Sequence, residues 1–173
     1  MKLLYLISLF ITIPGALAFA ITIPEDYTAK ILKFNDTYYA VNSTQNIIYG
    51  PDNDIGSVIN HIQNMLPSGS LIKIQCANYK LYTQINLTKS DDIEGIGDSY
   101  NCVSFTPQNK VSGSYVIWNS RTALSNISIN GNFDHQTYFD VETNGPMEID
   151  NFQLTNPNST GSNAILVGNR TEI

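Results

Sequence analysis

The sequence predicts an all-β protein in which residues 71–173 wind as a solenoid of short strands, preceded by a strand meander and one capping α-helix. Short apolar runs separated by Gly, Asn, Ser, Thr and Pro fill this part of the chain, as expected for strands joined by turns. A repeat of 25 residues begins at Asn101. A single stretch, residues 54–66, has helical spacing. The alternative fold is a β-sandwich, which also has short strands but has no reason to repeat its asparagines.

The composition excludes several classes of function. The chain has 173 residues, with 9 basic and 15 acidic side chains and a net charge of −6. A basic patch for nucleic acid or for an anionic membrane surface therefore lacks the residues to form it. With 14% charged and 42% apolar residues, the composition is that of a folded domain and not of a disordered chain. Two cysteines are too few for a disulfide-dense mini-fold.

Residues 1–20 are predicted to be a secretory signal peptide. Lys2 is followed by an apolar stretch that runs to Ile23, and small residues appear as ALA (16–18) and AFA (18–20). A basic start, an apolar middle and an A-x-A ending are typical of a signal cleaved after Ala18 or Ala20. An uncleaved anchor is the alternative. We therefore expect a secreted protein, or one on a cell or virion surface, with no membrane contact apart from this segment.

The N-glycosylation sequence N-x-S/T is relevant here because an exported chain can meet the glycosylation machinery. This sequence occurs at six asparagines, namely Asn35, Asn42, Asn86, Asn126, Asn158 and Asn169. An exported chain can carry N-linked glycans at such positions when its host has the pathway. The alternative is chance, because the chain is rich in Asn, Ser and Thr.

Residues 21–53 are predicted to form the meander. Strands are expected at residues 27–33, 38–41 and 47–49, with a turn at Asn35-Asp36 and an end at residues 50–53. Each run is short and bounded by polar or turn-forming residues. The pattern indicates neighbouring strands joined by tight connections.

Residues 54–70 are predicted to hold the capping helix. Its apolar face is expected to consist of Ile55, Val58, Ile59, Ile62, Met65 and Leu66. Asp54 or Asn53 can cap its start, and Pro67 and Gly69 end it. A helix this short is not stable alone. We therefore expect it to cover the end of the strand stack that follows.

Residues 71–173 are predicted to form about four coils. Strands are expected at Leu71–Ile74, Ile85–Leu87, Ile93–Ile96, Val103–Phe105, Tyr115–Trp118, Ile127–Ile129, Phe139–Val141, Met147–Phe152 and Ala164–Val167. The 25-residue period, taken without gaps, aligns two columns of asparagine, which are Asn101, Asn126, Asn151 and Asn119, Asn144, Asn169. It also aligns three further columns, which are Val116, Val141, Leu166, then Cys102, Ile127, Phe152, and Ser104, Ile129, Leu154. Apolar columns fill a narrow core, and asparagine columns stack their amides into a ladder.

A family resemblance follows from residues 54–97. The helix VINHIQNMLP, the polar break SGS, the strand LIKIQ and the later Gly95-Ile96-Gly97 resemble the opening of the pectate-lyase-like right-handed parallel β-helix superfamily. NISINGN (126–132) resembles the strand and turn of a later coil. The resemblance implies a right-handed parallel β-helix whose amino-terminal end is capped by the helix. The meander is similar to the lead-in of many exported archaeal and viral members.

The catalytic motifs of that superfamily do not carry over. The N-T-D, G-H-G and R-I-K motifs of its polygalacturonase branch are absent, and Asp91-Asp92 lies before the first full coil. Its lyase branch uses acidic calcium ligands with an arginine base, but no motif surrounds Arg121 or Arg170, which are the two arginines of the chain. The catalytic residues of an enzyme therefore stay unassigned by the sequence.

A candidate site for Ca²⁺ or a sugar consists of Asp134, Asp140 and Glu142. Asp140 and Glu142 flank Val141 and point the same way on a strand, and oxygen ligands suit calcium. Glu148 and Asp150 form a similar pair. The alternative is a solvated outer face, with Val141 pointing inward. No other cofactor is expected, because the distant His61 and His135 have no ligand companions and are expected at the surface.

Aromatic and sulfur side chains give two further expectations. Tyr79, Tyr82, Tyr100 and Tyr138, if exposed, can stack on sugar rings, whereas Trp118 is expected in the core. Cys76 and Cys102 lie about one coil apart in an exported chain, so that stacking would bring them together as a disulfide. The alternative is a pair of buried free thiols.

Two classes of function remain open. The first is an exported structural, adhesive or carbohydrate-binding β-helix, which the lack of catalytic motifs favours. The second is a polysaccharide lyase or glycoside hydrolase, or the amino-terminal fragment of one. The last repeat is two residues short of a full period and has no polar cap, so self-association through an open carboxy-terminal coil is expected.

Overall fold

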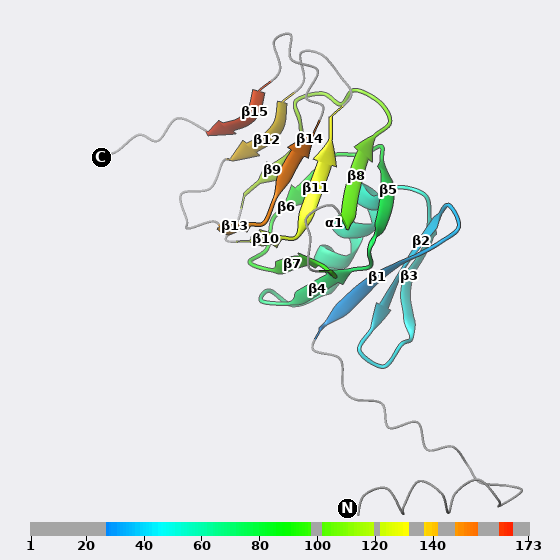
Figure 1. The fold of residues 1–173 in the computed structure, drawn as a ribbon. Coiled ribbons are helices and arrows are strands. Elements are labelled where there is room, and N and C mark those ends of the chain that lie inside the picture. The colour runs from blue at the N-terminus through cyan, green and yellow to red at the C-terminus, as the bar shows by residue number, and fades with distance from the viewer. Residues whose placement is uncertain are drawn as a thin grey trace, which may run out of the picture.

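The computed structural model of the protein describes residues 27–97, 102–119, 122–131, 137–141, 148–155 and 163–167. The predicted signal peptide, residues 1–20, lies outside the described residues. The described part consists of strands and one helix, and most of its strand pairs are parallel (Figure 1). It therefore has the predominantly β character that the sequence predicts.

The predicted meander is confirmed. Strands β1 (Ala29–Phe34), β2 (Thr37–Asn42) and β3 (Ile47–Asp52) pair antiparallel in chain order. The β1–β2 turn is Asn35-Asp36, as expected, because Phe34 pairs with Thr37 directly across it. Strand β3 extends beyond the predicted end at Tyr49.

The helix α1 (Ile55–Met65) also lies where its spacing places it. Of the two candidate caps, Asp54 is the one that accepts a hydrogen bond from the backbone of Gly56. Ile55, Val58, Ile59 and Ile62 are fully buried. Met65 was expected on the same face but is 51% exposed, whereas the polar Gln63 is buried. In the last turn, the buried face of the helix therefore includes Gln63 and not Met65. Packing against neighbouring elements, and not the polarity of the side chain, sets burial there.

The remaining strands form four rows of three. Their bounds are β4 (Leu71–Ile74), β5 (Ala77–Leu81), β6 (Ile85–Leu87); β7 (Asp92–Gly95), β8 (Val103–Pro107), β9 (Ser114–Trp118); β10 (Ala123–Ser125), β11 (Ile127–Asn130), β12 (Thr137–Val141); and β13 (Glu148–Asp150), β14 (Gln153–Thr155), β15 (Asn163–Val167). Every strand pairs in parallel with the strand three places along the chain. The chain therefore visits three sheets in turn.

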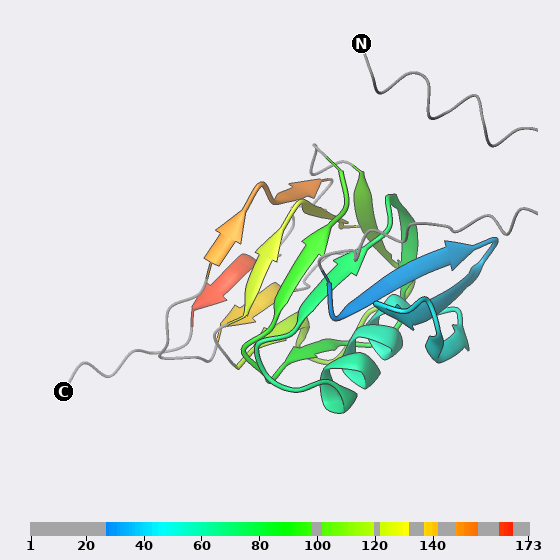
Figure 2. The same cartoon turned by 90° about the horizontal axis from the view of Figure 1, so that it is seen from below.

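In all three sheets, the strands of successive rows are added on the same side. The first has the order β13-β10-β7-β4-β1-β2-β3, the second β14-β11-β8-β5 and the third β15-β12-β9-β6. The meander joins the first sheet because β1 pairs in parallel with β4. Figure 2 shows the rows following one another away from α1 and the meander, from green to red. The helix contacts β5 and β6 of the first row as well as β2 and β3.

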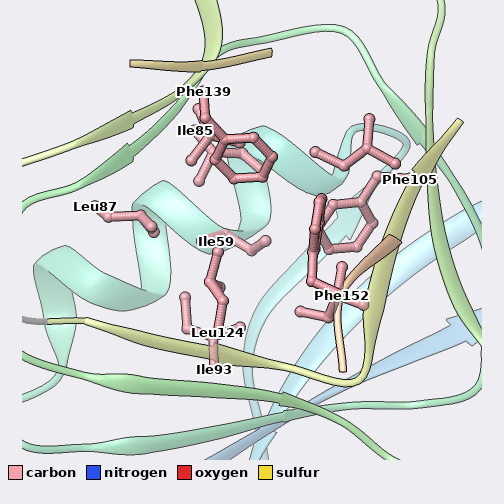
Figure 3. Close-up of a pocket in the computed structure, with 11 residues that line it drawn as sticks. Ile59, Ile85, Leu87, Ile93, Phe105, Leu124, Phe139 and Phe152 are labelled. Atoms are coloured by element: carbon pink, nitrogen blue, oxygen red, sulfur yellow. The ribbon is translucent and has the colours of Figure 1, made fainter. Parts of the chain in front are cut away.

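The core lies between the sheets and consists of in-register columns. Ile72, Ile93 and Leu124 align in the first sheet, Tyr79, Phe105 and Ile129 in the second, and Ile85, Val116 and Phe139 in the third. Ile59 of α1 closes this interior at the first row (Figure 3). The small interior pocket drawn there is lined entirely by apolar side chains, so it offers no group that would orient a polar ligand. Trp118 is buried, as expected.

The gapless 25-residue period predicted from Asn101 onward holds for two of the five strand pairs there, β10 with β13 and β11 with β14, and fails for the other three. Val103 pairs with Ile127, one residue short of that period, and Val116 pairs with Phe139, two residues short. The predicted column of Val116, Val141 and Leu166 therefore does not exist, because Val141 pairs with Trp118 and Val167. The reason is physical: pairing fixes the strands, while the connections between them vary in length.

The other predicted columns fare differently. Ile129 pairs with Leu154 as predicted, but Ser104 pairs with Ser128. Val103, and not Cys102, occupies the position beside Ile127. Asn126 and Asn151 do stack, whereas Asn101, Asn144 and Asn169 lie outside the described residues.

Four strand assignments need correction, and one of them is β14 (Gln153–Thr155), for which no strand was predicted. Strand β5 (ANYKL) and strand β10 (ALS) were missed, because the first interleaves apolar with polar residues and the second has one large apolar side chain. The predicted run Met147–Phe152 contains β13 and then a corner at Asn151, whose φ is 47°. A positive φ ends a strand, so an apolar run can cross a corner.

Candidate functional site

The exposed face of the first sheet carries four carboxylates in register. On β7, Asp92 and Glu94 point outward while Ile93 enters the core. On β13, Glu148 and Asp150 do the same around Ile149. Parallel pairing with β10 places each carboxylate of β7 in line with one of β13.

The strand between them has small side chains. Ala123 lies in register between Asp92 and Glu148, and Ser125 lies between Glu94 and Asp150. A hollow lined by these residues, Leu71 and Leu124 follows β10. We call it the acidic trough and define it by Asp92, Glu94, Glu148 and Asp150 as walls and Ala123 and Ser125 as floor.

The dimensions of the acidic trough follow from sheet geometry. Adjacent strands lie about 4.8 Å apart, so the backbones of the two walls are roughly 10 Å apart. Successive outward side chains along one strand are about 6.6 Å apart. The carboxylates on both sides can accept hydrogen bonds from hydroxyl or ammonium groups.

The charge of the acidic trough is negative. Lys73 of β4 stands beside Glu94 in register and provides a cation at one wall. The walls and floor themselves contain no basic side chain. Within the described ranges, no group of three or more His, Cys, Asp or Glu side chains is placed to hold a metal ion. The four carboxylates lie along the groove in two facing pairs.

Of the predicted site for Ca²⁺ or a sugar, only Asp140 lies among the described residues, so the structure does not test that site. Asp140 lies on β12 in the third sheet, in register with Ile117 and Leu166. Asp134 and Glu142 lie outside the described residues, as do His135 and Arg121. The acidic trough uses the Glu148 and Asp150 pair instead.

The other wall was missed, although the sequence contains a signal for it. Asp92-Ile93-Glu94 and Glu148-Ile149-Asp150 are the same acid-isoleucine-acid pattern, and Ala123-Leu124-Ser125 is its small-residue counterpart. The unequal spacing of these three segments hid the relationship, because a constant period does not align them.

The tyrosines proposed for sugar stacking are mostly buried. Tyr79 and Tyr138 are at most 1% exposed, which corrects the expectation for these two. Burial raises the pKa of the Tyr79 phenol above its usual range, and the nearby Tyr38 adds to this effect. Tyr82 is 37% exposed, and Tyr100 lies outside the described residues.

A second polar cluster surrounds Asp52 at the start of α1. Its Oδ2 accepts hydrogen bonds from the Tyr49 hydroxyl at 2.9 Å and the Ser57 hydroxyl at 2.7 Å. Burial alone would raise the pKa of Asp52, but these bonds and those from the backbone of Asp54 and Asn53 outweigh it, so the pKa is lowered. The exposed His61 stacks on Tyr49 with ring centroids 3.9 Å apart.

The Asp52 cluster is not a nucleophile site of the Ser-His-Asp type. The Ser57 hydroxyl donates to the Asp52 carboxylate and not to an imidazole, so the cluster lacks the serine–histidine contact of that triad. His61 contacts the cluster through its ring face. These bonds instead hold β3 against the first turn of α1.

The predicted disulfide is confirmed. Cys76 and Cys102 are bonded, with their Cα atoms 4.8 Å apart. Each cysteine directly precedes a residue of the Ala77–Val103 pair of β5 and β8. The bond therefore links the first and second rows at one corner.

The six predicted glycosylation sites differ in their surroundings. Asn35 and Asn86 are exposed, whereas Asn42 and Asn126 are half-buried. The Asn42 Oδ1 accepts hydrogen bonds from the backbone of Thr44 and Asn46. Asn158 and Asn169 lie outside the described residues.

The comparisons with known proteins found no relative of this chain. In the part of the chain that the structure describes, no helix is long and apolar enough to cross a membrane. No family model matches the sequence, and no curated protein or solved structure matches the chain. Interpretation of the acidic trough therefore depends on its own residues.

Proposed function

We propose that the protein is an exported right-handed parallel β-helix that binds a saccharide in the acidic trough. The observation that carries this proposal is the register of the trough, in which Asp92 and Glu148 face each other across Ala123, and Glu94 and Asp150 across Ser125. Its place is outside the cell, either secreted or on a cell or virion surface.

Four features support the fold and the location. The chain passes through three parallel sheets in turn, three strands to a row, and α1 packs on the first row. Residues 54–97 resemble the opening of pectate-lyase-like β-helices. The sequence of residues 1–20 has the pattern of an export signal, and a disulfide suits an oxidising compartment.

The charge of the acidic trough favours a neutral or cationic saccharide. Carboxylates accept hydrogen bonds from sugar hydroxyls and pair with the ammonium groups of amino sugars. A polyuronate would bring its own negative charges against four carboxylates, which is unfavourable unless cations lie between them. We therefore propose neutral or amino-sugar oligosaccharides as ligands.

Binding to defined oligosaccharides tests this proposal. The full chain is applied to an array of neutral, amino-sugar and uronate oligosaccharides, and the affinity for the best neutral or amino-sugar probe is measured by calorimetry. The double substitution Asp92→Asn with Glu148→Gln removes one facing pair, and we expect affinity to fall at least tenfold, or about 1.4 kcal/mol. Ala123→Trp fills the floor and should abolish binding.

A matched control is Asp36→Asn, which removes an exposed carboxylate, with its side chain 74% exposed, far from the trough in the sheet order. Its affinity should equal that of the wild type. Selective binding of uronates, or equal affinity of the trough variants, would refute the proposal.

Glycoside hydrolysis is the second candidate, and the facing carboxylates favour it. Inverting glycosidases place their acid and base about 6.5–9.5 Å apart, which a pair across two strand spacings can reach. Release of reducing ends from the bound oligosaccharide, lost in Glu148→Gln, would support hydrolysis. Products that absorb as unsaturated sugars would indicate a lyase, and binding without turnover would leave the binding function alone.

A further inference from the structure

The tip of the β1–β2 hairpin has an unusual combination of residues. The turn consists of Asn35 and Asp36, between the paired Phe34 and Thr37. Asn35 is exposed and has a φ of 55°. Figures 1 and 2 show the tip at the outer edge of the molecule, at the end of β1. The same four residues contain the N-x-T sequence at Asn35.

Phe34 is an aromatic side chain left in solvent. It is 69% exposed, the most exposed large apolar residue in the part of the chain that the structure describes. Phe34 is not part of the core, to which β1 contributes Ala29 and Ile31. The exposed part of this ring gains none of the free energy that burial of apolar surface provides.

The geometry of the tip is well defined. The Thr37 hydroxyl donates a hydrogen bond to the Phe34 carbonyl at 2.8 Å. Asp36 forms an ion pair with Lys80 of β5 at 3.5 Å, which ties the turn to the second sheet. Because Phe34 and Thr37 are directly paired, their side chains lie on the same face of the hairpin, next to Asn35.

We propose that Asn35 carries an N-linked glycan whose first sugar lies over the ring of Phe34. The inference rests on the export proposed above. The apolar face of a sugar ring, with its row of C–H groups, packs on an aromatic face and removes apolar surface from water. The glycan thereby covers part of the Phe34 surface that the chain leaves exposed.

The modification is a redox-neutral group transfer carried out by the host's transferase. The donor is an oligosaccharide linked through a diphosphate to a polyprenyl lipid. A bond forms between Asn35 Nδ2 and C1 of the first sugar, while the bond from C1 to the diphosphate oxygen breaks. The lipid diphosphate leaves, and the proton lost from Nδ2 passes to a base of the transferase.

The other described acceptor sequences lack this combination. Asn86 is exposed, but it lies within strand β6, without a turn. Asn126 is half-buried, and its side chain accepts a hydrogen bond from Asn151. Asn42 orders its own loop through Oδ1. A stabilising glycan is therefore expected at Asn35.

The first test is occupancy. The full chain is produced in insect or mammalian cells, and glycopeptides of the secreted protein are mapped by mass spectrometry. We expect a glycan at Asn35 in the wild type and in Thr37→Ser, which keeps the acceptor sequence, and its loss in Thr37→Ala. A secreted protein whose Asn35 is unmodified overturns the inference.

The second test is thermal coupling between the sugar and the ring. Tm is measured for the wild type, Phe34→Ala, Thr37→Ala and the double variant, each made in the secretory host and in a bacterial host without glycosylation. In the glycosylated set, Thr37→Ala should lower Tm by about 3 °C more with Phe34 present than with Phe34 replaced. Equal coupling in both hosts refutes the stacking.

Failure of export is distinguishable from failure of this inference. The chain is also produced with a host signal placed before residue 1. If only this form is secreted, the export signal proposed for residues 1–20 is wrong, and occupancy of Asn35 in the same sample still decides the glycan.

Discussion

The side chain of Asn151 lies on that of Asn126, from one row to the next. Its Nδ2 donates a hydrogen bond to the Asn126 Oδ1 at 2.6 Å, across a separation of 25 residues. Both asparagines have positive φ, 47° and 56°. They form the corner between the first and second sheets in successive rows. A Cβ added to Gly95 of the preceding row would collide with the Asn126 carbonyl, so the corner also needs a glycine below it.

The corner predicts that Asn126→Ala destabilises the fold. The substitution removes the amide oxygen that accepts the hydrogen bond from Asn151. It also places alanine at a positive φ, which asparagine tolerates better because its side chain can form local hydrogen bonds. Together these changes should lower the free energy of unfolding by about 2 kcal/mol. Urea unfolding measures the change. Asn126→Gly keeps the backbone conformation accessible and should cost less. If alanine and glycine are equally harmless, the stacked amides contribute nothing.

Asp54 should be among the least replaceable polar residues. It is 5% exposed and accepts hydrogen bonds from the backbone of Gly56, Tyr82 and Thr83, and from the Thr83 hydroxyl. Asp54→Ala removes the acceptor of the buried Gly56 amide and of three partly buried donors of Tyr82 and Thr83, so we expect a loss of about 2 kcal/mol or more in the free energy of unfolding. Chemical denaturation provides the measurement.

A control for Asp54 is the adjacent and exposed Asn53. Asn53→Ala should change the free energy of unfolding by less than about 0.5 kcal/mol. Similar effects at both positions would mean that the carboxylate network does not hold α1 to the first row.

Asp91 should make stability depend on pH in the direction opposite to a paired carboxylate. It is fully buried, and its Oδ2 has no hydrogen-bond partner, although its Oδ1 accepts from the Ser70 backbone. Burial raises its pKa above the ordinary 3.8 in spite of that bond. The folded state then holds the proton more tightly than the unfolded state. The stability that protonation of Asp91 provides is fully present below its pKa in the unfolded chain. It is lost as pH rises through its higher pKa in the folded protein.

The substitution Asp91→Asn removes this titration. We expect the variant to gain stability relative to the wild type between pH 3 and pH 7, by about 1.4 kcal/mol for each unit by which the pKa is raised. Unfolding in urea at several pH values measures it. Asp92→Asn, at the exposed neighbouring position, controls for the loss of one charge. A difference between Asp91→Asn and the wild type that does not vary with pH would contradict the account.

The Cys76–Cys102 bond should contribute strongly to stability. It closes a loop with a sequence separation of 26. Loop entropy predicts that the double substitution of both cysteines by alanine costs about 3 kcal/mol. Thermal unfolding of the oxidised wild type, the reduced wild type and the double variant measures this. The reduced protein should resemble the variant, and a reduced protein as stable as the oxidised one would contradict the prediction.

Local sequence was sufficient for the parts of the fold that depend on neighbouring residues. The helix follows from the spacing of Ile55, Val58, Ile59 and Ile62, and its start from Asp54, because periodicity and capping act within a few residues. The Asn35-Asp36 turn follows from turn chemistry. The cysteine pair could be inferred because its separation is close to the length of one row.

The candidate site depended on register and so escaped the sequence. Asp92 and Glu148 become neighbours across Ala123 only when β7, β10 and β13 are paired, and the connections between these strands differ in length. The period predicted from Asn101 onward did not include β7, so it could not place Asp92 beside Ala123. Within the repeat, its constant length placed Val141 in a column with Val116, where Phe139 actually lies.

By itself, the sequence determined the meander, the position of α1, the strand-rich character of the rest and the disulfide, since each depends on local pattern or on a single separation. The tertiary structure decided which strand lies beside which, and hence the acidic trough, the burial of Tyr79 and Tyr138, and the exposure of Phe34. Side-chain alternation tells which residues face the core, but hydrogen bonding between distant strands sets which of the outward residues meet.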